Sequence, residues 1–310
     1  MNASVRRVFF HIRSLRVQGA EQIALEAVKA LASAASSSRA RSKQAFMDEL
    51  ERAAVFLESA RPTEPAMRTE LSRVISKVRN SGLSGVGALK DLVEEEALKY
   101  SRFIEVSKKR LAGFGARLIR KNAVVLVHCH SSSVMSVLKH SFDSGNKSMR
   151  VFCTESRPHF QGRISSVELA DYGIDTTMVV DDSALFFLKK GVDVVLVGAD
   201  AITERGELVN KIGSCTIAAA SKESGVPFYS CTMLHKYDPF TEGGREEPIE
   251  FRDPRELVAD LSPASCRNFA KVKLLNPAFD VTPCGLVRGF VTEKGVFSPL
   301  QAVRIAKKLF

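Results

Sequence analysis

From Asn122 onward the chain alternates short apolar, β-branched runs with segments of helical periodicity. The runs lie in AVVLV, MRVFCTES, TTMVVDD, VDVVLVGAD and VPFYSCTM, with a late one in GLVRGFVTEKG. Continuous apolar strands separated by helices are typical of a parallel sheet that is covered on both faces. The sequence therefore predicts an α/β fold with a Rossmann-like, doubly wound parallel sheet over residues 121–310.

The first 120 residues carry helical periodicity and no strand pattern. Apolar residues recur three and four apart in GAEQIALEAVKALASAA, SKQAFMDELERAAVFLESA, MRTELSRVISKVRN and ALKDLVEEEALKYSRFIEVSKKRLAGFGARLIR. The basic start MNASVRRVFFHIRSLRVQGA continues into the first of these segments, which favours one folded helix over a signal or transit peptide. We therefore expect an all-helical N-terminal domain at residues 1–120.

Composition narrows the classes of function. No apolar run approaches the roughly 18 residues that a membrane span needs. The six cysteines lie far apart among 310 residues, which favours reduced thiols and a cytoplasmic protein. The net charge of +10 suits anionic partners, but no Lys/Arg cluster is interleaved with aromatic residues, so nucleic acid is disfavoured. No GxGxxG follows a strand, and no dinucleotide cofactor is expected.

The triplet His128-Cys129-His130 follows the first predicted strand. If the strand continues through it, the two histidines face one way and the cysteine the other. One metal ion could not easily bind all three, and no second ligand motif occurs. We therefore expect no metal site. Two interpretations remain open: a small thiol buried in a core, or the edge of an active site.

Polar residues follow five of the predicted strands. Cys129 and the serines Ser131, Ser132 and Ser133 follow the first; later strand ends carry Glu155, Arg157, Gln161, Arg163, Asp181, Asp182, Asp200, Asn210, Lys211, His235 and Lys236. Carboxyl ends of parallel strands meet in one crevice, where ligands bind. Each residue also has a structural alternative, because Asp200 or the serines could cap helices and the lysines could be solvated. Together they favour a phosphorylated ligand.

Several motifs resemble one known family. GADAITERGELVNKIGS resembles the GAD…NG…NKIGT signature shared by archaeal ribose-1,5-bisphosphate isomerases, 5-methylthioribose-1-phosphate isomerases and the alpha, beta and delta subunits of eukaryotic translation initiation factor 2B. ARPTEP, HCHSSSV, ESRPHFQGR and NPAFDVTP resemble further motifs of the family, so the resemblance extends from about Gln18 almost to the C-terminus.

The resemblance is greatest to ribose-1,5-bisphosphate isomerase. It implies conversion of α-D-ribose 1,5-bisphosphate to ribulose 1,5-bisphosphate in nucleotide (AMP) salvage, without a cofactor, by a homo-dimer or homo-hexamer. The catalytic pair maps onto Cys129 and Asp200. One phosphate site maps onto Gln18, Gly19, Ala20, Arg61 and Ser131–Ser133, and the other, with the sugar hydroxyls, onto Asn210, Lys211 and Lys236. Two alternative functions stay open, a non-catalytic regulatory subunit and a methylthioribose-1-phosphate isomerase. Whether AMP activates the protein also stays open.

The implied chemistry needs one acid and one base. We expect Cys129 to take the proton from C2 and Asp200 to protonate the ring oxygen, which gives an enol phosphate. Lys211, Lys236 or a helix start should lower the pKa of the thiol. The chain also departs from the family, which has Arg-Gly-Ala-Gly at residues 18–21. Gln18 and Glu21 replace its arginine and second glycine, and a glutamate beside a phosphate should weaken binding.

Overall fold

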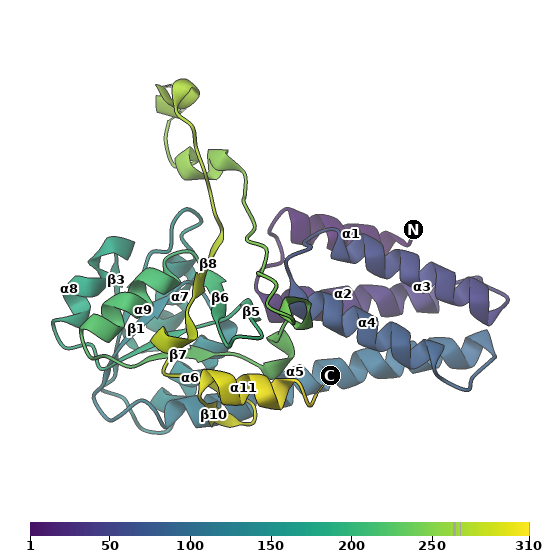
Figure 1. The fold of residues 1–310 in the computed structure, drawn as a ribbon, viewed down its shortest axis with the longest axis horizontal. Coiled ribbons are helices and arrows are strands. Elements are labelled where there is room, and N and C mark those ends of the chain that lie inside the picture. Colours follow the sequence, from purple (N-terminus) through teal and green to yellow (C-terminus); the bar gives the residue numbers. More distant parts are fainter. Residues whose placement is uncertain (263–264, 267, 310) are drawn as a thin grey trace. The chain divides into compact units, whose positions relative to one another are not determined.

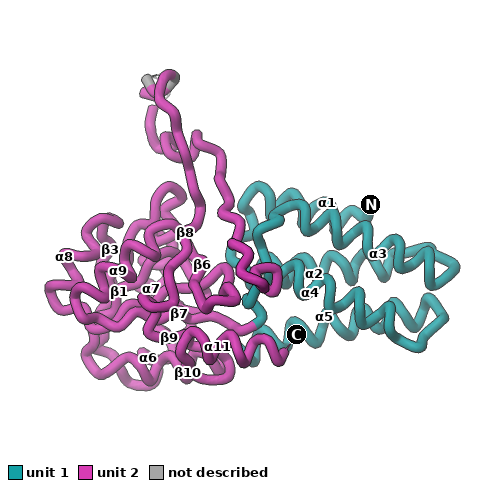
Figure 2. The backbone as a smooth tube through the Cα atoms, in the orientation of Figure 1, with its two compact units in different colours: residues 1–107, 235–238 teal, residues 108–234, 239–310 magenta. Residues whose placement is uncertain are grey.

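The computed structural model describes residues 1–262, 265, 266 and 268–309, and these form two compact units. Unit 1 contains residues 1–107 and 235–238, and unit 2 contains residues 108–234 and 239–310 (Figure 2). The expected domain boundary at residues 120/121 falls within unit 2. The short segment 235–238 belongs to unit 1 although both of its neighbours along the chain belong to unit 2.

Unit 1 is helical throughout its longer segment (Figure 1). It holds α1 (Ala3–Arg13), α2 (Ala20–Ser36), α3 (Lys43–Glu58), α4 (Pro65–Arg79) and the larger part of α5 (Val86–Ala116). The α2 helix packs against α1, α3 and α4, and the apolar side chains Leu31, Leu50, Leu57 and Leu71 between them are buried. The predicted helical N-terminal part is thus confirmed.

One continuous helix at the N-terminus was predicted, and that prediction is wrong. The α1 helix ends at Arg13, and Leu15 and Gly19 then adopt φ angles of 59° and 80°. Left-handed φ angles interrupt a right-handed helix, and glycine adopts them at no steric cost. Gly19 is the N-cap of α2, so the chain restarts as a second helix one residue later.

Unit 2 is built around a seven-stranded sheet in the order β10-β9-β7-β4-β1-β2-β3. Its strands are β1 (Val124–His128), β2 (Arg150–Thr154), β3 (Asp175–Val179), β4 (Val194–Val197), β7 (Phe228–Cys231), β9 (Gly289–Thr292) and β10 (Gly295–Phe297). All pair in parallel except β10, which forms an antiparallel hairpin with β9. The predicted parallel α/β sheet is confirmed, and the late apolar run forms its edge hairpin.

Helices connect these strands. They are α6 (Ser132–Asp143), α7 (Gln161–Asp171), α8 (Ala184–Leu188) and α9 (Ser214–Glu223), while α11 (Pro299–Ala306) follows the last strand, β10. Single turns of 3-10 helix lie at η1 (Asp181–Ser183), η2 (Leu234–Lys236), η3 (Pro239–Thr241), η4 (Pro254–Val258), η5 (Asn268–Lys271) and η6 (Cys284–Leu286). The α7 helix approaches β2 so closely that a Cβ on Gly162 would lie 1.6 Å from the Thr154 carbonyl oxygen, so glycine is required there. None of the helices in the described ranges has the length and apolarity to cross a bilayer.

A second, three-stranded sheet was not predicted. It consists of β5 (Ala201–Ile202), β6 (Leu208–Lys211) and β8 (Phe279–Thr282), in antiparallel pairing. The β6 strand is short and half polar, and its partner β8 lies almost 70 residues further along the chain. The sequence pattern of β6 alone therefore does not reveal the pairing, which aligns Asn210 with Asp280 and Lys211 with Phe279.

Candidate active site

The order of strands marks one edge of the main sheet as a ligand site. The chain adds β2 and β3 on one side of β1 and then returns to place β4 on its other side. Ligands bind in open α/β sheets at such a reversal, beyond the carboxyl ends of the two strands. Because His128 of β1 pairs with Val197 of β4, both strands end in step. Cys129 and Gly198 are therefore the first residues beyond the sheet, with Asp200 two residues later.

Cys129 has an unusual backbone conformation. The strand ends at His128, and Cys129 adopts a φ of 66°, in the left-handed region that non-glycine residues rarely occupy. Its N–H donates to Ser156 Oγ at 2.7 Å, and its carbonyl accepts from Ser165 Oγ at 3.1 Å. The strand ends before Cys129, so the condition under which the side chains of the triplet would alternate is not met. Strain of this kind is concentrated at functional sites.

The two neighbouring histidines contact different parts of unit 2. The buried His128 places Nε2 2.9 Å from the Ile212 carbonyl, to which it donates, and Nδ1 2.6 Å from Thr154 Oγ1. Burial lowers the pKa of His128, so the ring is neutral at pH 7. His130 Nδ1 lies 3.1 Å from Ser165 Oγ. Both histidines thus hold the loop around Cys129 in place.

Asp181 has a role that the sequence did not reveal. Its two carboxylate oxygens accept hydrogen bonds from the N–H groups of Ser156 and Arg157, at 2.7 and 2.8 Å. Ser156 itself has a φ of 59°, and its hydroxyl accepts the N–H of Cys129. The carboxylate therefore fixes the loop after β2, and this loop in turn fixes the cysteine.

Charged groups surround the thiol. Asp200 donates its N–H to the Val209 carbonyl at 2.9 Å, which places it beside β6, and Lys211 of β6 is buried. Burial raises the pKa of Cys129 to about 11; Lys211 acts in the opposite direction, and the negative charges of Asp200 and Asp181 raise the pKa further. The prediction that the pKa of Cys129 is lowered is wrong, because the effect of the lysine is smaller than the increase that burial causes. These interactions nevertheless place Cys129, Asp200 and Lys211 in one electrostatic environment.

Gly198 brings two more predicted residues to the same place. A Cβ on Gly198 would lie 2.7 Å from Ser131 Oγ and 3.8 Å from Asn210 Oδ1, so both side chains surround its Cα. Asn210 is buried and donates to Ser214 Oγ at 2.8 Å. Ser131 is the N-cap of α6, where its hydroxyl accepts from the N–H of Val134. Glycine at position 198 therefore allows α6 and β6 to meet at the end of β4.

The other serines lie in the first turn of α6. Lys108 Nζ donates to Ser132 Oγ at 3.1 Å, and Ser133 is fully buried. The backbone N–H groups at a helix start, with a lysine beside them, form a favourable environment for a phosphate. Unit 2 thus brings together Cys129, Ser131–Ser133, Asp200, Asn210 and Lys211, from β1, α6, the turn after β4, and β6.

The remaining predicted residues belong to unit 1. Gln18 is exposed and donates through Nε2 to the Leu15 carbonyl at 2.9 Å, Gly19 is the N-cap of α2, and Ala20 is buried. Arg61 pairs with the buried Glu64 at 3.3 Å. Lys236 lies 3.7 Å from Glu21, and both side chains are buried. Two cations expected to bind substrate thus each have a carboxylate within the same unit.

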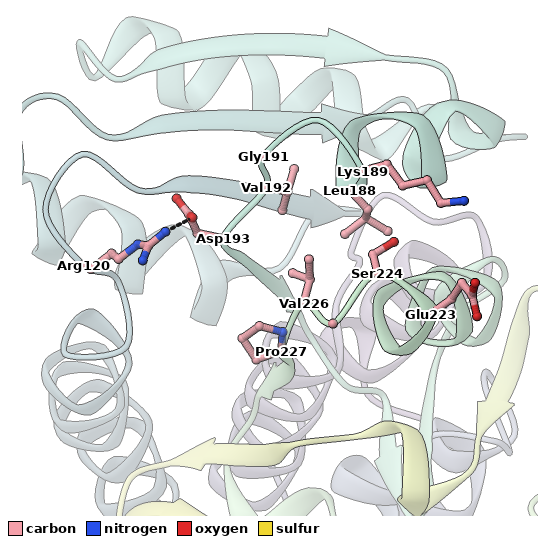
Figure 3. A pocket seen from close by; sticks show the side chains of 11 residues that line it. Arg120, Leu188, Lys189, Gly191, Val192, Asp193, Glu223, Ser224, Val226 and Pro227 are labelled. Atoms are coloured by element: carbon pink, nitrogen blue, oxygen red, sulfur yellow. Dashed lines mark hydrogen bonds and ion pairs between the residues drawn. The ribbon is translucent and has the colours of Figure 1, made fainter.

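A cavity of about 580 Å³ lies elsewhere in unit 2 (Figure 3). It is lined by Val192 and Asp193, which precede β4, and by Val226 and Pro227, which precede β7. Asp193 forms an ion pair with Arg120. Cys129 follows β1, which is parallel to β4, so this cavity lies at the opposite edge of the sheet from the cysteine. It contains no predicted site residue.

The chain is similar in sequence to known proteins along nearly its whole length. Residues 16–299 match the model of the Initiation factor 2 subunit family. The chain is 35% identical to a ribose 1,5-bisphosphate isomerase of Methanocaldococcus jannaschii, over 99% of this chain and 95% of the relative. It is also 35% identical to a 5-deoxyribose 1-phosphate isomerase of Moorella thermoacetica, over 99% of this chain and 89% of the relative.

A solved structure extends the likeness to the fold. The crystal structure described as the translation initiation factor eIF-2B of Pyrococcus horikoshii superposes with a TM-score of 0.82 at 25% identity, covering 98% of this chain and all of that one. The match to the family model and the similarity to the isomerases both span nearly the whole chain. The chain belongs to the Initiation factor 2 subunit family.

Proposed function

We propose that the protein is an aldose–ketose isomerase that converts α-D-ribose 1,5-bisphosphate into ribulose 1,5-bisphosphate. The observation that carries the proposal is the electrostatic grouping of Cys129, Asp200 and Lys211 at the reversal of strand order. A thiol, a carboxyl group and a lysine supply a base, an acid and an anion-binding group in one place. The name of the Methanocaldococcus jannaschii relative supports the choice of substrate.

The reaction requires four proton transfers on one carbon skeleton. The anomeric oxygen carries a phosphate, so the ring opens only if an acid protonates the ring oxygen while a base removes the proton from C2. The resulting enol phosphate gains a proton at C1 and loses one from O2, which yields the ketose. In our proposal Cys129 serves the carbon atoms and Asp200 serves the oxygen atoms, and no cofactor takes part.

The protonation state of the pair follows from its surroundings. Because burial raises the pKa of Cys129 to about 11, the resting thiol is protonated and is not yet a base. Transfer of its proton to the Asp200 carboxylate, directly or through the substrate, would create the thiolate base and the carboxylic acid in one step. Lys211 lowers the pKa of the thiol and therefore favours this transfer.

The substrate-binding residues of the proposal are those that the family resemblance assigns. Gln18, Gly19, Ala20, Arg61 and the helix start at Ser131–Ser133 would bind one phosphate. Asn210, Lys211 and Lys236 would bind the other phosphate and the sugar hydroxyls. The proposal also includes a cytoplasmic enzyme of nucleotide (AMP) salvage that works as a homo-dimer or homo-hexamer, with AMP tested as an activator.

The test is turnover of ribose 1,5-bisphosphate by the purified protein, with and without AMP. Wild type should form ribulose 1,5-bisphosphate, and Cys129→Ser and Asp200→Asn should each lower kcat by about 10²–10⁴-fold, the usual contribution of an acid or a base. Cys284→Ser is the matched control, because this partly buried thiol lies in η6, and it should keep wild-type turnover. Absence of turnover in wild type under both conditions would instead favour a non-catalytic regulatory subunit.

A further inference from the structure

His128 connects the end of β1 to the turn that follows β6. Its Nε2 donates to the Ile212 carbonyl at 2.9 Å, and Ile212 comes directly after Lys211. The N–H of Ile212 in turn donates to the Ala278 carbonyl at 3.0 Å, just before β8. The imidazole therefore ties the small three-stranded sheet, which carries Lys211, to the main sheet, whose strand β1 leads to Cys129.

The other ring nitrogen of His128 faces the loop that supports Cys129. Its Nδ1 lies 2.6 Å from Thr154 Oγ1 and 3.5 Å from Ser156 Oγ. Because a carbonyl oxygen can only accept, Nε2 carries the proton of the neutral ring, and Nδ1 accepts from the Thr154 hydroxyl. The Ser156 hydroxyl accepts the N–H of Cys129 at 2.7 Å. One imidazole thus contacts both the supports of Cys129 and the turn beside Lys211.

The ring also fills the space next to this turn. Gly213 has a φ of 101° and is the N-cap of α9, and a Cβ on it would lie 3.1 Å from His128 Nε2. Protein interiors are close-packed, and a shorter side chain leaves a gap into which its neighbours partly relax. Shortening the side chain at position 128 should therefore allow the turn at residues 211–213 to move.

His128 itself is unsuited to act as an acid or a base. Its side chain is buried with an exposed fraction of 2%, and both ring nitrogens have partners within unit 2. Burial has the largest influence on the pKa values of His128 and Cys129, and the charge of Lys211 lowers both. Lys211 therefore lies close enough to act on both residues, and an effect of the neutral imidazole on the thiol must pass through position rather than charge.

We propose that His128 is a positioning residue, which holds the turn at residues 211–213 against the loop of Cys129 so that Lys211 stabilises the thiolate. The inference rests on the proposed function, because the thiolate is the base that the isomerisation requires. It gives His128 a part in the reaction, although its ring is enclosed by protein.

The test is a double-mutant cycle on alkylation of Cys129 by iodoacetamide at pH 9, which needs no substrate. His128→Asn keeps an amide near Thr154 but is too short to reach the Ile212 carbonyl. It should slow alkylation by at least about threefold, which equals a rise of about half a unit in the pKa of the thiol. Lys211→Met should slow alkylation at least as much. The double variant should be no slower than Lys211→Met alone, because the histidine acts through the lysine.

His128→Gln provides the rescue. The amide nitrogen of glutamine reaches the place of Nε2 and can donate to the Ile212 carbonyl, so alkylation should return to within about twofold of wild type. The kcat for ribose 1,5-bisphosphate should fall in His128→Asn and recover in His128→Gln. His140→Asn is the matched control, because this histidine lies exposed in the last turn of α6, and it should leave both rates unchanged.

Three outcomes would overturn the inference. Alkylation of His128→Asn as fast as wild type, or faster, would mean that the variant only loosens the site and exposes the thiol. Additive slowing in the double variant would separate the histidine from the lysine, and a glutamine variant no better than asparagine would exclude the contact with Ile212. Each of these would leave the isomerase intact if wild type turns over. Wild type without turnover would overturn the proposed function, while the alkylation cycle would still decide whether His128 positions Lys211.

Discussion

Gly198 offers a test of the geometry of the candidate site. Its φ lies outside the left-handed region, so alanine fits the backbone, but an alanine Cβ would lie 2.7 Å from Ser131 Oγ and 2.8 Å from Ser131 Cβ. Both distances are below any ordinary contact, and overpacking of this kind typically costs about 1–3 kcal/mol. Restriction of the unfolded chain by alanine offsets about 0.4–1 kcal/mol of that. We expect Gly198→Ala to lower the free energy of unfolding by about 1–2 kcal/mol.

Ser131→Gly removes both clashing atoms and provides the rescue. Ser131 caps α6, and replacing a serine cap by glycine usually costs only a few tenths of a kcal/mol. The double variant Gly198→Ala/Ser131→Gly should therefore be more stable than Gly198→Ala alone, with a coupling of about 1 kcal/mol. Urea unfolding of the four proteins measures this cycle. The reasoning is refuted if Gly198→Ala has wild-type stability, or if the double variant is no more stable than Gly198→Ala.

Two further predictions concern pH. Because burial raises the pKa of Cys129 to about 11, alkylation of this thiol by iodoacetamide should quicken by about tenfold per pH unit from pH 7 to 10. Peptide mass spectrometry measures the rate, and a plateau below pH 9 would contradict the raised pKa. Burial also raises the pKa of Asp280 from 3.8 to about 6, although its carboxylate accepts the N–H groups of Gly213 and Cys215. Because the pKa of this carboxyl group is raised in the folded state, its protonated form stabilises the fold below pH 4. This stabilisation is lost as the pH rises through 6. Relative to Asp280→Asn, wild type should therefore lose up to about 3 kcal/mol of unfolding free energy between pH 4 and 7. A gain over that range, measured by urea unfolding, would show that the ionised carboxylate is the better cap.

The strand pattern anticipated where Cys129 and Asp200, the two candidate catalytic residues, lie in the sheet. Cys129 and Asp200 follow the strands β1 and β4, and the rule that ligands bind beyond parallel strands was enough to place them at one edge. The supports of the cysteine were not anticipated. Asp181 and Ser156 follow β3 and β2, and their hydrogen bonds depend on two left-handed residues that no sequence pattern specified.

The ionic partners were also beyond the sequence. Glu21 stood out as a departure from the family, but its pairing with Lys236 joins residues more than 200 positions apart. The direction of the pKa shift at Cys129 also depends on the folded structure. A lysine near a thiol lowers its pKa, but at Cys129 burial raises the pKa by more than the lysine lowers it. Distant contacts and burial are properties of the folded chain, and a local pattern contains neither.

By itself the sequence determined the class of most segments outside the small sheet, because apolar periodicity and β-branched runs act over a few residues. It indicated helices before Asn122, and alternating strands and helices after it. Tertiary structure alone decided three further features. It paired β6, which carries Asn210 and Lys211, with β8; it assigned the segment 235–238 to the helical unit; and it buried Glu21 and Lys236 and raised the pKa of Cys129. Pairing between distant strands and exclusion of water depend on the whole fold, so these features emerge only when the chain is assembled.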